Sequence, residues 1–188
     1  MFFNLPNSLT WFRILAIPLV VIVYYLPGDW AHPAAGWLFG LAGITDLLDG
    51  YLARKLGQTS KFGAFLDPVA DKLIVATALV LLVQNDPKPY LAIVAAIIVG
   101  REITVSALRE WMSEVGARAR VAVTYFGKWK TTMQIFGISF MLHEQPLFGI
   151  EIYRPGMILL FVAAALTILS MIDYLRGAWP VIKKSDSS

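Results

Sequence analysis

Six apolar runs, each about 20 residues long, constrain the fold of this 188-residue chain more than any other feature. A helix of about 20 residues crosses the roughly 30 Å hydrocarbon core of a bilayer. Hydrophobic residues make up 57% of the chain and charged residues 15%, whereas a soluble domain has roughly 45–50% and 25%. We therefore expect an all-α, polytopic membrane protein. Its six transmembrane helices are predicted at residues 9–27, 34–55, 66–83, 90–112, 128–147 and 155–176.

The lysines and arginines predict the orientation of these spans. If both termini lie on one side, that side holds 14 of the 16 basic residues, and the opposite loops hold only Lys88 and Arg154. Basic residues collect on the cytosolic side of membrane proteins, so we expect both termini to face the cytosol. We expect one domain over residues 1–188, with a short juxtamembrane segment at 1–8 and a flexible tail at 181–188. The chain has no cysteine, which excludes disulfides and thiolate-bound metals.

Four aspartates lie at the cytosolic ends of the second and third spans. Asp46 and Asp49 are three residues apart and Asp67 and Asp71 are four apart, so each pair shares one face of a helix. A turn at residues 57–60 makes the two helices neighbours, and the two pairs can therefore meet. Carboxylate oxygens are the hard ligands that Mg²⁺ and Mn²⁺ prefer. Two such ions held by these pairs could clamp the oxygens of a phosphate during its displacement.

Small residues lie beside the aspartates. Gly50, Ala53 and Gly63 leave the helix surface bare, so that a bulky phosphorylated group can approach the backbone closely. A competing interpretation makes Asp67 a helix N-cap ahead of Pro68 and pairs the acids with neighbouring basic residues. That interpretation does not explain why four carboxylates and three small residues occur together at helical spacing.

The pattern Asp46-x2-Asp49-Gly50-x2-Ala53-Arg54-x8-Gly63-x3-Asp67-x3-Asp71 matches, without a departure, the signature of the CDP-alcohol phosphatidyltransferases, and the chain resembles this family. Its members are six-helix integral membrane enzymes that replace CMP on a CDP-linked lipid with an alcohol. Four further segments extend the resemblance over nearly the whole chain and are most similar to bacterial members that make phosphatidylglycerol phosphate. These segments are NLPNSLTWFRILAIP, FGAFLDPVADK, GREITVSALREWM and FGKWKTTMQ.

The resemblance implies a role for each matching residue on the donor side. The four aspartates would bind two divalent ions, Mg²⁺ or Mn²⁺, and Asp71 would also act as the general base. The remaining signature residues would line the CDP site, together with three residues of the opening segment. The CDP-binding candidates are Gly50, Ala53, Arg54, Gly63, Asn7, Thr10 and Arg13.

Basic residues of the fourth and fifth spans are candidates for an acceptor site. Arg101 and Arg109 are eight residues apart, so both can face one pocket, and arginine grips phosphate oxygens through paired hydrogen bonds. The resemblance favours Arg101, Arg109 and Lys128 as a phosphate pocket, with Lys130 as a further candidate. Glu102 would hold the arginines in place. Basic residues on the cytosolic side also enforce topology or bind anionic lipid. This is the alternative role for the remaining basic residues of the predicted cytosolic segments.

Together these observations predict a transferase of the bacterial inner membrane with a polar, cytosol-facing cavity. It would transfer the phosphatidyl group of CDP-diacylglycerol to glycerol 3-phosphate, giving phosphatidylglycerol phosphate and CMP on the route to phosphatidylglycerol and cardiolipin. The family's habit suggests a homodimer. Other acceptors stay open, namely inositol phosphate, serine or phosphatidylglycerol. A divalent-cation transporter is the alternative from another class, although its site would lie near the midplane with access from both faces.

Overall fold

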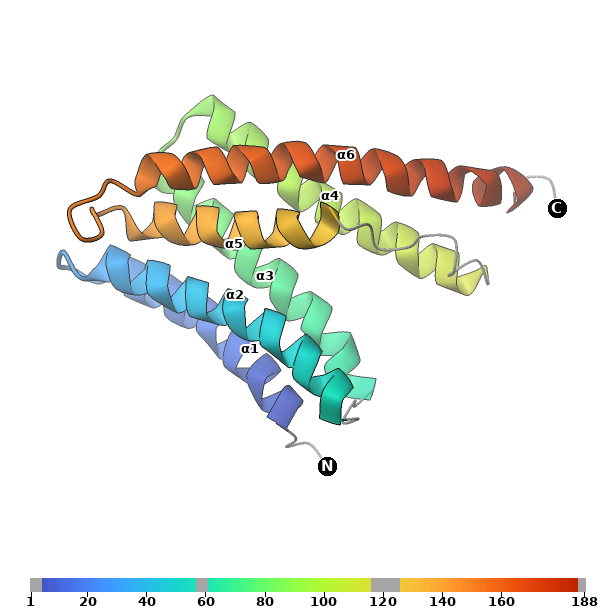
Figure 1. Cartoon of the computed structure of the whole chain (residues 1–188), viewed down its shortest axis with the longest axis horizontal. Helices are drawn as coiled ribbons and strands as arrows, with labels where there is room; N and C mark the ends of the chain where they lie inside the picture. The colour runs from blue at the N-terminus through green and yellow to red at the C-terminus, as the bar shows by residue number, and fades with distance from the viewer. Residues whose placement is uncertain (1–4, 57–60, 116–125, 186–188) are drawn as a thin grey trace.

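The computed structural model describes residues 5–56, 61–115 and 126–185, and the side chains within 10–45, 66–115 and 129–183. These residues form six helices and no strand, which confirms the all-α class (Figure 1). The helices are α1 (Leu5–Tyr24), α2 (Ala31–Leu56), α3 (Lys61–Asn85), α4 (Pro89–Glu114), α5 (Phe126–His143) and α6 (Tyr153–Ser185).

The start of α1 and the end of α6 differ from the predicted boundaries. Helix α1 begins at Leu5, inside the predicted juxtamembrane segment, because Pro6 lies in the first turn, where its missing N–H costs nothing. Helix α6 continues through Pro180 to Ser185, so helix covers most of the predicted tail. Lys183 lies 5.8 Å from the ring centroid of Trp179, one turn earlier, and this contact supports the last turns.

Helix α5 ends at His143, four residues before the predicted boundary. Glu144 has φ 58°, and Phe148 and Gly149 also have positive φ, so the chain leaves the helix through left-handed backbone. The connection to α6 therefore starts earlier than its apolar residues suggested.

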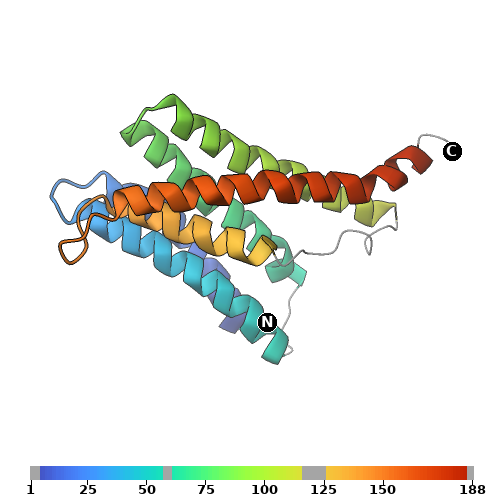
Figure 2. The same ribbon diagram turned by 45° about the horizontal axis from the view of Figure 1, so that its top comes forward.

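The helices gather at one end of the bundle and diverge at the other, as both views show (Figure 1, Figure 2). We call these the narrow end and the splayed end. The loops after α1, α3 and α5 meet at the narrow end, where Nδ1 of His32 lies 2.5 Å from Oε2 of Glu144 and Tyr153 donates to Asp86 at 3.0 Å. The start of α1 and the end of α6 lie at the splayed end. His32, at the start of α2, therefore ties this helix to the loop after α5, at the other end of the bundle from the predicted site.

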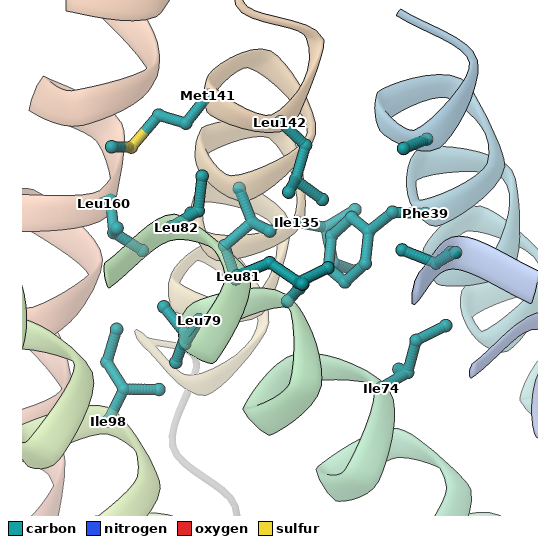
Figure 3. Close-up of a cluster of buried hydrophobic side chains, with 14 of the residues drawn as sticks. Phe39, Ile74, Leu79, Leu81, Leu82, Ile98, Ile135, Met141, Leu142 and Leu160 are labelled. Atoms are coloured by element: carbon teal, nitrogen blue, oxygen red, sulfur yellow. The ribbon is translucent and has the colours of Figure 1, made fainter. Parts of the chain in front are cut away.

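A buried apolar cluster joins the helices between these ends (Figure 3). Phe39 of α2, Ile74 of α3 and Ile135 of α5 are among its members. Glycines allow the helices to approach closely. A Cβ on Gly36 would lie 2.8 Å from the backbone oxygen of Ser139, and one on Gly137 would lie 2.9 Å from that of Gly156. The contacts of α5 with α2 and α6 therefore require glycine.

Large apolar side chains also cover the outside of the bundle. Leu15, Val80, Ile103 and Leu169, from four different helices, are each more than half exposed. Within the described residues, two helices are long and apolar enough to cross a membrane, Pro89–Glu114 and Tyr153–Lys183, and Thr10–Tyr24 is a shorter apolar helix. An apolar exterior on every side is typical of lipid contact rather than of water.

Candidate active site

The acidic wall of the site is built on α3. Asp67 and Asp71 are one turn apart inside this helix, so Asp67 is not an N-cap, because α3 already begins at Lys61. Helix α1 packs beside them and supplies two donors. Thr10 donates to Oδ1 of Asp67, and Arg13 donates to Oδ1 of Asp71, while Nη2 of Arg13 lies 3.8 Å from Oδ1 of Asp67.

Arg13 is a charged residue at a buried position of α1. Its side chain is only 1% exposed, although it carries a full charge. A buried charge is stable only when it is paired and hydrogen-bonded. Arg13 was predicted to contact the nucleotide, and the structure places it against the two α3 carboxylates.

The opposite acidic pair lies on α2, which continues as a helix to Leu56. The side chains of several predicted site residues lie outside those that the structure describes. They are Asp46, Asp49, Gly50, Ala53, Arg54, Gly63, Asn7 and Lys128. The structure therefore describes two of the four predicted metal ligands.

A cavity of about 230 Å³ opens beside the acidic wall. Helices α1, α2, α3, α4 and α5 all contribute to it, so it lies at the centre of the bundle rather than on one surface. Its floor is apolar and its walls carry charged and polar groups. The lining residues are Arg13, Phe39, Ala42, Gly43, Asp71, Lys72, Ile74, Val75, Glu102, Thr131, Gln134 and Ile135.

A charge cluster surrounds Glu102, which lines the cavity from α4. Oε1 of Glu102 accepts from Nη1 of Arg101 at 2.6 Å and from Nζ of Lys130 at 2.9 Å. Arg101 is 8% exposed and Lys130 is 3% exposed, whereas Glu102 itself lines the cavity. Removing one partner from such a buried group costs about 3–5 kcal/mol, because a charge is then left uncompensated.

Helix α6 fixes the two arginines of α4. Nη2 of Arg101 donates to Oγ of Ser170 at 3.0 Å, and Arg109 donates to the hydroxyl of Tyr174. The guanidinium carbons of Arg109 and Arg101 lie 5.0 and 5.9 Å from the centroid of the Tyr174 ring. Arg101 and Arg109 therefore both lie at Tyr174 of α6, and neither is among the residues that line the cavity.

The charges of this cluster suit a dianion. Arg101, Arg109 and Lys130 carry three positive charges and Glu102 carries one negative charge, which leaves two positive charges uncompensated within the cluster. A phosphate monoester at neutral pH carries about −1.5 to −2. Phosphate would compete with the Glu102 carboxylate for the same donors, since both are oxyanions.

The described acids fit a divalent cation in their chemistry. Thr10 and Arg13 contact the Oδ1 atoms, and the side chains of Asp67 and Asp71 remain 43% and 38% exposed. Each carboxylate is therefore accessible to a hard ion. Among the described residues, no group of three or more His, Asp or Glu side chains gathers around one point. A complete metal site would need the acids of α2.

Three residues of this site did not stand out in the sequence. Gln134 lies in a segment that the sequence marks only by its resemblance to the family, and Ser170 and Tyr174 lie in the sixth predicted span. The available signal for the last two was their spacing of four, which places two polar groups on one face of a mostly apolar helix.

A cavity lined by Asp71 and Glu102, with basic residues bound to Glu102, is suited to a phosphorylated group. A model of the CDP-alcohol phosphatidyltransferase family matches residues 3–169. The chain belongs to this family.

Among curated proteins, the chain is similar to enzymes named CDP-diacylglycerol–glycerol-3-phosphate 3-phosphatidyltransferase. It is 50% identical to the one from Haemophilus influenzae over 94% of each chain. It is 48% identical to the one from Pseudomonas fluorescens, over 96% of this chain and 92% of that one. For the Escherichia coli K12 protein the identity is 47%, over 94% and 95%.

Proposed function

We propose that this protein transfers the phosphatidyl group of CDP-diacylglycerol to glycerol 3-phosphate, giving phosphatidylglycerol phosphate and CMP. Relatives of nearly the same length, at 47–50% identity, are named for this reaction. The observation in the structure that carries the proposal is the cavity lined by both Asp71 and Glu102. Asp71 offers a carboxylate, and the described cluster of Glu102 with Arg101, Arg109 and Lys130 has an excess of two positive charges.

The donor would bind on the side of α1, α2 and α3. Asp46, Asp49, Asp67 and Asp71 are the residues that would hold two divalent ions, Mg²⁺ or Mn²⁺. Such ions neutralise the pyrophosphate and stabilise the charge that develops on departing CMP. Thr10 and Arg13 hold the α3 carboxylates in place. The CDP moiety would occupy the surface of Gly50, Ala53, Arg54 and Gly63, with Asn7 nearby.

The acceptor would bind on the side of α4 and α5. The cluster of Arg101, Arg109 and Lys130, with Lys128, would hold the phosphate of glycerol 3-phosphate. Asp71 would remove the proton from the free primary hydroxyl. The oxygen would then form a bond to the phosphorus that bears diacylglycerol, and the bond from that phosphorus to the CMP oxygen would break.

We infer that all six helices cross the bacterial inner membrane, with the splayed end and both termini in the cytosol. The 14:2 distribution of basic residues and the apolar exterior support this placement. It would let the lipid donor reach the cavity from the bilayer and the phosphorylated acceptor reach it from water. The family's habit supports a homodimer.

The acceptor can be tested with purified protein in detergent. CDP-diacylglycerol and Mg²⁺ are supplied with glycerol 3-phosphate, inositol phosphate, serine, inositol or phosphatidylglycerol, and CMP release is measured for each. We expect release with glycerol 3-phosphate at least about tenfold above every other acceptor, because only a matched phosphate gains the contacts to Arg101 and Arg109. Faster release with another acceptor, or none with any, would reject the proposal.

A further inference from the structure

The side-chain amide of Gln134, on α5, lines the cavity without a hydrogen-bond partner among the described residues. Its side chain is 5% exposed and lines the cavity wall. Within the part of the chain that the structure describes, no hydrogen bond reaches this amide, and its atoms are not sealed inside the protein. Buried polar groups in proteins are almost always hydrogen-bonded. A buried amide that faces a cavity therefore indicates a ligand group that completes it.

The neighbours of Gln134 indicate which ligand this is. Along α5 it lies one turn beyond Lys130, which belongs to the charge cluster, and the same cavity is lined by Asp71 and Glu102. The predicted nucleotide residues lie on α1, α2 and α3, and one of them, Arg13, lines the same cavity. Because Gln134 shares α5 with Lys130, we assign its amide to the acceptor rather than to the nucleotide.

Glycerol 3-phosphate bound by its phosphate and by its reacting hydroxyl would place its middle hydroxyl in this cavity. If its phosphate meets the cluster and its reacting hydroxyl meets Asp71, the middle carbon of glycerol 3-phosphate lies between them with a second hydroxyl. A hydroxyl both donates and accepts, and a glutamine amide also offers both functions. We propose that Gln134 binds this middle hydroxyl and so determines specificity for a glycerol backbone, an inference that rests on the proposed function.

The test compares two acceptors in one enzyme. Propane-1,3-diol monophosphate keeps the phosphate and the primary hydroxyl of glycerol 3-phosphate but lacks the middle hydroxyl. For the wild type we expect a kcat/KM at least about tenfold lower with this analogue, because the buried amide is left unpaired. For Gln134→Leu we expect the two values to lie within about threefold, since an apolar side chain gains nothing from the hydroxyl.

The ratio of the two values is independent of how much of a variant folds, because both acceptors are used by the same active molecules. Ser139→Ala is the matched control. It removes a hydroxyl from the same helix, where Ser139 donates to the backbone oxygen of Gly36 at 2.8 Å, away from the cavity lining. Its ratio should equal that of the wild type, and the KM of CDP-diacylglycerol should be unchanged in Gln134→Leu.

Two results would overturn the inference while leaving the proposed function intact. One is a Gln134→Leu variant that discriminates between the acceptors as strongly as the wild type. The other is a changed KM for CDP-diacylglycerol with an unchanged acceptor ratio, which would assign the amide to the nucleotide. If the wild type does not use glycerol 3-phosphate at all, the proposed function fails, and the inference fails with it.

Discussion

Asp71 is held by a hydrogen bond and is also accessible from the cavity, two properties that usually conflict. It accepts a charge-assisted hydrogen bond from Arg13 at one oxygen, and it also lines the cavity where a substrate must be reached. The bond to Arg13 fixes the orientation of the carboxylate, and the exposed remainder of the side chain leaves room for a second partner. A carboxylate that is oriented but not enclosed is suited to accept a proton from a bound hydroxyl.

The role of Asp71 can be tested by Asp71→Asn, which keeps the shape and removes the charge. We expect kcat to fall by at least about 10²-fold, the usual contribution of a general base. The thermal unfolding temperature in detergent should change little, because an amide oxygen can still accept from Arg13. Asp86→Asn is the control, since Asp86 lies at the narrow end and bonds only Lys88 and Tyr153 among the described contacts. Wild-type kinetics in Asp71→Asn would contradict the assignment.

At the residue scale, the sequence predicted which side chains share one face of a helix. The spacing of Asp67 and Asp71 predicted a shared face, and both lie inside α3. It did not reveal the bond between Arg13 and Asp71, which joins residues 58 positions apart. Periodicity tells which face of a helix a side chain occupies, but it does not tell which helix that face will meet.

At the scale of elements, α6 acts on the site without lining the described cavity. Ser170 and Tyr174 are buried and hold Arg101 and Arg109 of α4. The face of the tyrosine ring carries partial negative charge, so its attraction for the two guanidinium groups offsets part of their mutual repulsion. Helix α6 therefore sets the positions of the arginines that would receive the acceptor phosphate.

This positioning role predicts a specific kinetic change in Tyr174→Phe. The ring remains, but the hydroxyl that binds Arg109 is lost. We expect the KM of glycerol 3-phosphate to rise by roughly tenfold with kcat within about twofold, as for the loss of one hydrogen bond to a charged group. The KM of CDP-diacylglycerol should not change. Tyr153→Phe, on the same helix, loses the bond to Asp86 at the narrow end and should behave as the wild type. Equal effects of the two variants would argue against a positioning role for Tyr174.

The elements themselves were predictable because length and hydropathy determine them. Each of the six helices overlaps its predicted span. Their ends were less predictable, since Pro68 and Pro180 lie within helices that the rules for proline would shorten or bend. Tyr174 escaped notice for a different reason. A tyrosine in an apolar run is ordinarily packing, and only the approach of α4 shows otherwise.

At the scale of the whole molecule, the narrow end and the splayed end differ in structure. The narrow end is closed by contacts such as His32 with Glu144, whereas the helices diverge at the end where α1 starts and α6 finishes (Figure 1). The cavity is lined by residues from the middle parts of the helices. A membrane enzyme that joins a lipid to a soluble molecule needs an opening to both phases. The splayed end, placed in the cytosol, would provide it.

The absence of cysteine makes this orientation directly testable. Phe148, in the loop between α5 and α6, is 95% exposed at the narrow end, and Ser113 is exposed in the last turn of α4. In intact cells freed of their outer membrane, a membrane-impermeant maleimide should label Phe148→Cys and not Ser113→Cys. Inverted vesicles should give the opposite pattern, and the cysteine-free parent should not be labelled. Labelling of both positions from one side would refute the orientation.

The most direct measurement follows the acceptor into the product. Purified protein is given CDP-diacylglycerol and glycerol 3-phosphate labelled in its carbon chain, with Mg²⁺ or with a chelator, and label in the lipid fraction is counted against CMP released. We predict one labelled glycerol phosphate in lipid for each CMP, and none with the chelator. CMP released without label entering lipid, or label entering lipid without CMP, would contradict phosphatidyl transfer at this site.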